Sequence, residues 1–234
     1  MIKNYLFDLD GTLLPLDEDD FLDKYMNLIG KKFYELGLDP KEMVDKLWLG
    51  TKAMIENNGE KSNEDVFWEV FYPYKDKQND LKTKLEKFYT NEFNHVFTST
   101  NPSPYSQKIL EALKEKGVKI YLLTNPIFPK VATMRRIEWA GLDASDFTYI
   151  TSYENSSFAK PNIKYYQDIL DKFNLNPSET IMVGNDVYED MIAAELGMKT
   201  YLIKDCLKNT LDKDYKHFEQ GTLEDFYRNY LLKD

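Results

Sequence analysis

The sequence is poor in cysteine and in long apolar runs, and each shortage excludes a class of protein. Cys206 is the single cysteine of 234 residues, so the chain can form no internal disulfide and no cysteine-based metal cluster. No stretch approaches the roughly 18 to 20 consecutive apolar residues that cross a bilayer. The opening residues, MIKNYLFDLD, reach acidic side chains at once and lack the apolar run of a secretion signal. We therefore expect a cytoplasmic protein without a membrane partner.

Basic side chains are also in deficit, because 30 Lys and Arg face 40 Asp and Glu for a formal net charge of −10. Nucleic-acid binding depends on neutralising phosphates with Lys and Arg, so this balance argues against a nucleic-acid partner. An anionic substrate would need a bound metal ion or local lysines to overcome the overall field. Apolar residues, at 42%, and aromatic residues, at 15%, are plentiful enough for a substantial core.

An alternation of short apolar runs and amphipathic stretches predicts the fold class. Residues 4–10, NYLFDLD, predict a buried strand that ends in acidic residues and in a turn at Gly11. The alternation resumes after residue 102, which predicts a Rossmann-like parallel sheet flanked by helices, an α/β core. The further predicted strands are 118–124, 147–151, 180–183 and 199–203, and the predicted helices are 104–116, 130–140, 163–173, 188–196 and 223–232.

Residues 15–100 break this alternation. Their apolar residues recur at helical spacing, as in Phe21, Tyr25, Leu28 and Ile29. We therefore expect an all-α domain over residues 15–100, inserted after the first strand of a core made of residues 1–14 and 101–234.

Four short polar segments each follow a predicted strand, at the edge where open α/β sheets bind ligands. The first is Asp8-Leu9-Asp10-Gly11-Thr12. Residues i and i+2 of an extended chain point to the same side, so Asp8 and Asp10 should face one cleft. Two carboxylates in one cleft are costly without a cation or a shared proton. Mg²⁺ accepts such oxygen ligands, whereas the simpler alternative is a surface Asp pair beside a turn.

The other three segments are weaker when taken singly. Thr124 and Asn125 end a predicted strand, where a hydroxyl could contact a phosphoryl oxygen or only terminate the strand. Lys160 precedes a proline in a loop, and exposed lysines are common. Asp186 and Asp190 lie one turn apart on a predicted helix, where acids also complement the helix dipole. Four such segments in this order are jointly hard to explain by chance.

The pattern resembles the haloacid dehalogenase superfamily, in its phosphatase branch with a helical cap, over residues 4 to about 203. The Asp8–Thr12 segment would be the first and most specific motif, followed by Thr124, Lys160 and the Gly184–Asp190 segment. The resemblance implies that Asp8 attacks phosphorus and forms an aspartyl-phosphate. It also implies that Asp10 acts first as general acid and then as general base.

The resemblance further implies a Mg²⁺ cofactor, held by Asp8, by the backbone carbonyl of Asp10 and by the fourth motif. Many relatives have Gly-Asp in that motif, where this chain has Gly184-Asn185-Asp186. Either Asn185 or Asp186 would be the ligand, with Asp186 slightly favoured. Asp190 would be an acceptor behind the ligands.

Phosphate binding would fall to the second and third motifs. The resemblance implies that Thr124 and Asn125 hold phosphoryl oxygens, and that Lys160 neutralises the charge shared by Asp8 and the phosphate.

Within this family, an acid two residues after the nucleophile separates phosphatases from dehalogenases, because an alkoxide leaving group needs a proton and a halide does not. Asp10 therefore favours a phosphatase acting on a small phosphorylated metabolite, of the nucleotide or sugar phosphate class. A dehalogenase or phosphonatase-type hydrolase and a catalytically silent binding protein are the alternatives. Trp48 and Lys52 are candidates for the specificity pocket, and nothing in the sequence indicates an oligomeric state.

Overall fold

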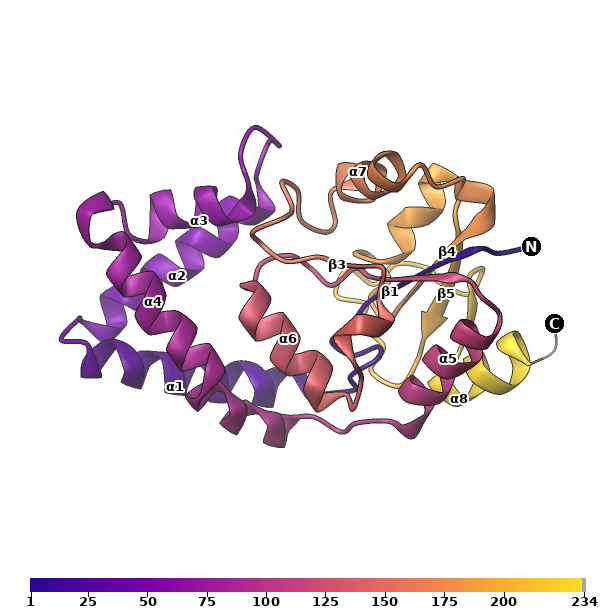
Figure 1. The fold of residues 1–234 in the computed structure, drawn as a ribbon, viewed down its shortest axis with the longest axis horizontal. Helices are drawn as coiled ribbons and strands as arrows, with labels where there is room; N and C mark the ends of the chain where they lie inside the picture. The colour runs from indigo at the N-terminus through magenta and orange to yellow at the C-terminus, as the bar shows by residue number, and fades with distance from the viewer. Residues whose placement is uncertain (233–234) are drawn as a thin grey trace.

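A parallel sheet lies at the centre of the computed structural model, which describes residues 1–232 (Figure 1). The strand order is β3-β2-β1-β4-β5-β6, and each neighbouring pair is parallel. This arrangement confirms the predicted Rossmann-like α/β fold class. The strands are β1 (Asn4–Phe7), β2 (Lys119–Leu122), β3 (Tyr149–Ile150), β4 (Thr180–Gly184), β5 (Lys199–Ile203) and β6 (Glu219–Gly221).

Helices cover both faces of the sheet, which explains why β1 and β4 are buried along their whole length. One face packs on α7 (Ile163–Phe173), where Leu6 and Met182 meet Ile169. The other face packs on α5 (Pro104–Glu115) and on the C-terminal helical segment, where Phe7 and Phe226 join the larger core cluster. The remaining core elements are α6 (Lys130–Trp139), α8 (Leu223–Asp225), the π-helical turn Phe226–Leu231 and the short 3-10 helices Ala144–Asp146, Pro177–Glu179 and Met191–Leu196.

The chain between β1 and α5 forms a block of helices beside the sheet, here named the helical insertion (Figure 1). Asp17, Asp39 and Ser62 cap its first three helices by accepting backbone N–H groups. Its two connections to the core pair with each other, since the Asn101 N–H donates to the Pro15 carbonyl at 2.7 Å. Its elements are α1 (Glu18–Glu35), α2 (Pro40–Ile55), α3 (Asn63–Phe71), α4 (Lys75–Thr90) and the 3-10 helix Glu92–Ser99.

Several predicted boundaries were wrong. The first strand ends at Phe7, so Asp8 and Asp10 lie in the turn that follows and not in extended chain. The predicted helix 223–232 is a short α-helical turn followed by a π-helical turn. The edge strand β6 was not predicted, because Glu219, Gln220 and Gly221 carry no apolar alternation. No helix within residues 1–232 is long and apolar enough to cross a membrane.

Candidate active site

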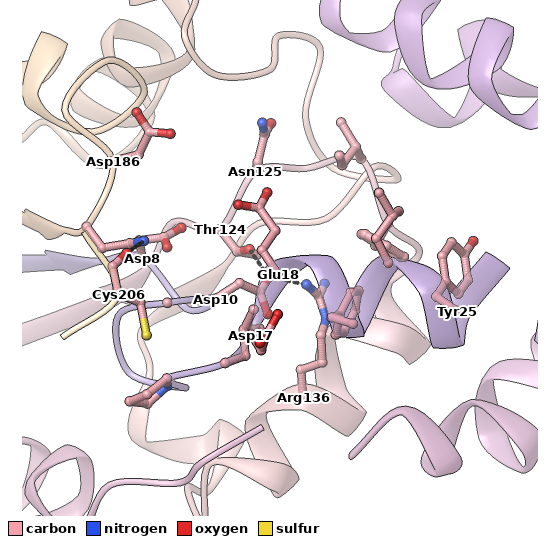
Figure 2. Close-up of a pocket in the computed structure, with 18 of the residues that line it drawn as sticks. Asp8, Asp10, Asp17, Glu18, Tyr25, Thr124, Asn125, Arg136, Asp186 and Cys206 are labelled. Carbon is pink, nitrogen blue, oxygen red and sulfur yellow. Dashed lines mark hydrogen bonds and ion pairs between the residues drawn. The ribbon is translucent and has the colours of Figure 1, made fainter. Parts of the chain in front are cut away.

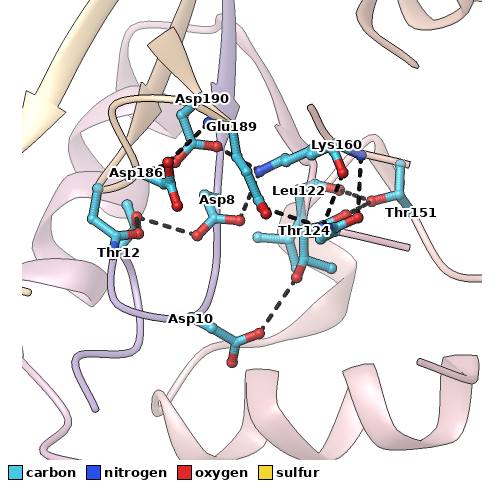
Figure 3. A network of polar contacts seen from close by, with 12 residues as sticks. Asp8, Asp10, Thr12, Leu122, Thr124, Thr151, Lys160, Asp186, Glu189 and Asp190 are labelled. Carbon is cyan, nitrogen blue, oxygen red and sulfur yellow. Dashed lines mark hydrogen bonds and ion pairs between the residues drawn. The ribbon is translucent and has the colours of Figure 1, made fainter. Parts of the chain in front are cut away.

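The carboxyl ends of neighbouring strands bring the predicted site residues to one edge of the sheet (Figure 3). Asp8 follows β1, Thr124 follows β2 and Asn185 follows β4, while Lys160 lies on the loop after β3. Because β2 and β4 pair with opposite sides of β1, this edge is the topological switch point at which α/β sheets bind ligands. A cavity of about 1180 Å³ opens there. The predicted site residues that line it are Asp8, Asp10, Thr124, Asn125, Asn185, Asp186 and Asp190.

Lys160 joins two carboxylates beneath the cavity (Figure 3). Its Nζ lies 2.8 Å from Asp8 Oδ1 and 2.6 Å from Asp190 Oδ1, and its side chain is only 1% exposed. Burial alone would lower the pKa of Lys160, but the Asp190 and Asp8 carboxylates outweigh it and raise that pKa well above its usual value. Burial raises the pKa of Asp8 to about 7 although Lys160 acts to lower it. Full ionisation of Asp8 at neutral pH therefore requires more positive charge than Lys160 supplies.

Arg136 is a site residue that the sequence analysis missed. It lies on α6 with its side chain 2% exposed, and its guanidinium forms an ion pair with Asp10 Oδ2 (Figure 2). The Thr124 hydroxyl lies 3.5 Å from the same oxygen. Asp10 Oδ1 is buried without a hydrogen-bond partner among the described residues. Burial raises the pKa of Asp10, against the opposing effect of Arg136. The site thus holds a carboxyl with one unpaired oxygen, as a proton donor requires.

The turn after Asp10 depends on glycine. Gly11 has a φ of +80°, and a Cβ at this position would lie 2.3 Å from Asn185 Nδ2. This close approach places the Thr12 hydroxyl 2.9 Å from Asn185 Oδ1 and 3.3 Å from Asp8 Oδ2. The first and fourth segments are therefore linked through one hydroxyl.

The helix predicted to contain both Asp186 and Asp190 does not form. Asp186 Oδ1 accepts the N–H groups of Tyr188 at 2.7 Å and Glu189 at 2.9 Å. The Asp186 N–H donates to Asp190 Oδ2 at 3.0 Å. Side-chain acceptors of this kind compete with helical hydrogen bonds, so a turn occupies this segment and the 3-10 helix begins only at Met191. Asp186 and Asp190 thus share a turn and not a helix face.

The oxygen atoms around Asp8 suit a hard divalent cation. No group of three or more His, Cys, Asp and Glu side chains fit to hold a metal occurs in residues 1–232. The candidate donors here also include an amide oxygen, Asn185 Oδ1, and the carbonyl of Asp10, which the bridge to Leu14 leaves outside its hydrogen bonds. Mg²⁺ accepts carboxylate, amide and carbonyl oxygens alike. Burial raises the pKa of the carboxyl of Asp186, the other candidate of the fourth segment.

Asn125 braces the site through its side chain. Its Oδ1 accepts the Lys160 N–H at 3.2 Å, and its Nδ2 donates to Glu189 Oε2 at 3.2 Å. Burial raises the pKa of Glu189 to about 7. Of the two candidates for the specificity pocket, Trp48 lines the cavity and Lys52 is not among the described lining residues.

The fold and the site together define a class of protein. An open parallel sheet with Asp8 at its switch point, a second acid two residues later and a buried lysine against the first acid is typical of hydrolases that use an aspartate nucleophile. The family model described as haloacid dehalogenase-like hydrolase matches residues 5–203, and the chain belongs to this family.

Curated relatives of this chain are phosphatases. It is 27% identical to a glyceraldehyde 3-phosphate phosphatase of Methanocaldococcus jannaschii over 96% of this chain and 95% of that protein. It is 32% identical to a glyceraldehyde 3-phosphate phosphatase of Pyrococcus furiosus, but that match spans about half of each protein, 53% and 51%. The resemblance to the haloacid dehalogenase superfamily and the expectation of a hydrolase related to phosphatases are thereby confirmed.

Solved structures of low sequence identity share the fold. A HAD phosphatase from Thermococcus onnurineus has a TM-score of 0.58 at 20% identity, covering 96% of both chains. Bacillus subtilis YfnB, a HAD hydrolase bound to magnesium, has a TM-score of 0.56 at 18% identity, covering 97% of both chains.

Proposed function

We propose that this protein is a magnesium-dependent phosphatase that hydrolyses a phosphate monoester through an aspartyl-phosphate on Asp8. The observation that carries the proposal is the pairing of Asp8 with Lys160 at 2.8 Å beside an acid with an unpaired oxygen, Asp10. We further propose that residues 1–14 and 101–234 form the catalytic core and that residues 15–100 form a cap over it.

In the first step, an Asp8 carboxylate oxygen attacks phosphorus and the bond from phosphorus to the alcohol oxygen breaks. Asp10 donates its proton to the departing alkoxide. In the second step Asp10 removes a proton from water, the water oxygen attacks phosphorus, and the bond between phosphorus and Asp8 breaks to release inorganic phosphate. The raised pKa of Asp10 supports its role as the acid, because a buried carboxyl holds its proton closer to neutral pH.

Lys160 and Thr124 would stabilise the charge that develops on the transferred phosphoryl group. Arg136 would keep Asp10 oriented through its ion pair, since it approaches Asp10 from α6. Asn125 would hold the Lys160 loop against Glu189 in addition to contacting phosphate.

Mg²⁺ would be held by Asp8, by the Asp10 carbonyl and by Asn185 or Asp186. When bound, it supplies positive charge that offsets the repulsion between an anionic nucleophile and an anionic substrate. Two observations support this fit. Asp8 is incompletely compensated by Lys160, as its raised pKa indicates, and the neighbouring oxygens are of the kind that Mg²⁺ accepts.

Asp10 argues against a dehalogenase, whose halide leaving group needs no proton. A catalytically silent binding protein is disfavoured because Asp8, Asp10, Thr124 and Lys160 are all present and share one edge of the sheet. The phosphatase relatives favour a small phosphorylated substrate over a macromolecule, since the site lies beneath the helical insertion.

The decisive experiment measures release of inorganic phosphate from p-nitrophenyl phosphate and a panel of phosphate esters, with Mg²⁺ or with EDTA. The wild type should turn over only with Mg²⁺, and Asp8→Asn should be inactive. Detection of ³²P on the protein after acid quenching, in the wild type and not in Asp8→Asn, would support the covalent step. A folded, Mg²⁺-binding protein without turnover on any ester would refute the proposal, and release of halide from haloacids would replace it by the dehalogenase alternative.

A further inference from the structure

The cavity beside Asp8 extends far into the helical insertion, and its walls change character on the way. On α1 the lining residues run from Glu18, near the acids of the site, to Phe33. At a rise of 1.5 Å per residue this wall is about 22 Å long. Deeper in the insertion the lining is mostly apolar and aromatic. It includes Ile29, Leu47, Phe67, Trp68, Leu85 and Phe128.

The tyrosine hydroxyls and the indole N–H in this part of the cavity are already paired with protein groups. The hydroxyls of Tyr25 and Tyr89 lie 2.8 Å apart. Trp68 Nε1 donates to the Tyr153 hydroxyl at 3.3 Å. These pairs leave little hydrogen-bonding capacity for the hydroxyl groups of a sugar or for the polar edge of a base.

The list of unpaired buried atoms supports the same conclusion. Within residues 1–232 the buried side-chain nitrogen and oxygen atoms without a partner are Asp10 Oδ1, Tyr121 Oη and Ser152 Oγ, and of these residues only Asp10 lines the cavity. The charged residues that α4 adds to the lining are accounted for, because Lys82 pairs with Glu64 and Glu86 is exposed. A polar substrate buried in the insertion would lose its hydrogen bonds to water without replacement.

We infer that the substrate is the phosphate monoester of an alcohol with a long apolar chain. The phosphate lies at Asp8 and the chain follows α1 into the insertion. This inference rests on the proposed phosphatase function and specifies its substrate class. The cavity, at about 1180 Å³, exceeds the roughly 300–1,000 Å³ of common small-ligand pockets, so a three-carbon phosphate would leave its apolar part unfilled.

The test uses a series of linear alkyl phosphates from ethyl to decyl, each below its critical micelle concentration, with Mg²⁺. Each added methylene should raise kcat/KM about threefold until the cavity is filled, because burial of a methylene favours binding by that order. Glycerol 3-phosphate, ribose 5-phosphate and glyceraldehyde 3-phosphate should be poorer substrates than octyl phosphate by at least two orders of magnitude.

A binding measurement separates this inference from catalysis. The corresponding alkylphosphonates cannot be hydrolysed, and two of the three tryptophans, Trp48 and Trp68, line the cavity. Their fluorescence should report a Kd that falls about threefold per methylene.

Thr51 offers a matched pair of variants, since its side chain lines the cavity from α2 and is only partly buried. Thr51→Phe fills space and should shift the preferred chain to a shorter length. Thr51→Val keeps the size, loses the hydroxyl bond to the Leu47 carbonyl and should leave the preferred length unchanged. Leu49→Phe, at an exposed position of α2 outside the described lining, controls for an added ring elsewhere on the helix.

The outcomes are distinct. Turnover of p-nitrophenyl phosphate without any dependence of kcat/KM and Kd on chain length would overturn the apolar-chain inference and leave the phosphatase proposal standing. Absence of turnover on every ester, with alkylphosphonate affinity still rising with length, would overturn the phosphatase proposal and support the apolar site. A preferred length unaffected by Thr51→Phe would place the chain elsewhere and overturn the inference.

Discussion

Replacement of the proposed nucleophile by its amide should stabilise the metal-free protein while abolishing its activity. The folded environment raises the pKa of Asp8 from 3.8 to about 7, chiefly through burial. The shift is about 3 pKa units, and at about 1.36 kcal/mol per unit it corresponds to about 4 kcal/mol as an upper bound. Because Asp8→Asn removes the buried charge and keeps the shape of the side chain, part of this free energy should appear as added stability.

The sign of the effect depends on pH. Since the folded-state pKa of Asp8 lies above the unfolded value, its contribution to stability is fully present below about pH 3.8 and is lost as pH rises to about 7. The difference between Asp8→Asn and the wild type in EDTA should therefore be small at pH 5 and large at pH 8. In a protein of this size each kcal/mol shifts Tm by about 2–4 °C.

The assay is urea unfolding and differential scanning calorimetry of both proteins at pH 5 and pH 8, with EDTA or with Mg²⁺. Mg²⁺ should stabilise the wild type more than the variant, because the charge it offsets is present only in the wild type. A variant that is no more stable than the wild type at pH 8 in EDTA would refute the reasoning.

Three further changes test the other site residues. Lys160→Met should abolish turnover and lower the free energy of unfolding by about 3–5 kcal/mol, because Asp8 and Asp190 then lack their counter-ion; urea unfolding that matches the wild type would contradict this. Asp10→Asn should lower kcat by about 10² to 10⁴-fold and keep Mg²⁺ affinity by titration calorimetry, since the proposed ligand is a backbone carbonyl. Arg136→Gln should move the alkaline limb of the kcat/KM profile to higher pH, because Arg136 lowers the pKa of Asp10; an unmoved limb would exclude that coupling.

Local patterns in the sequence were sufficient to predict most helices and strands of the core. Strand β4 lies within a fully buried apolar run, which a parallel sheet covered on both faces requires. Ser103 caps α5 as predicted, and α7 spans the predicted residues 163–173. These features depend on residues within one or two turns of each other, so a short window of sequence contains their cause.

Tertiary structure decided the features that depend on partners distant in the chain. Strand β6 forms because its backbone pairs with the edge of β5 and not because of its side chains. The pairing of Arg136 with Asp10 joins residues 126 positions apart. Its only local signal was a charged side chain beside buried Ala132 and Ile137 on α6.

The same division holds within the site. The sequence by itself determined the class of chemistry, because the order Asp8, Asp10, Thr124 and Lys160 along an alternating α/β pattern restricts where those groups can meet. Only the folded chain decided that Asp186 caps a turn, that Asp10 meets an arginine and that the cavity has an apolar far end. Those outcomes depend on burial and on the competition among hydrogen-bond acceptors, which side chains experience only after distant elements have packed together.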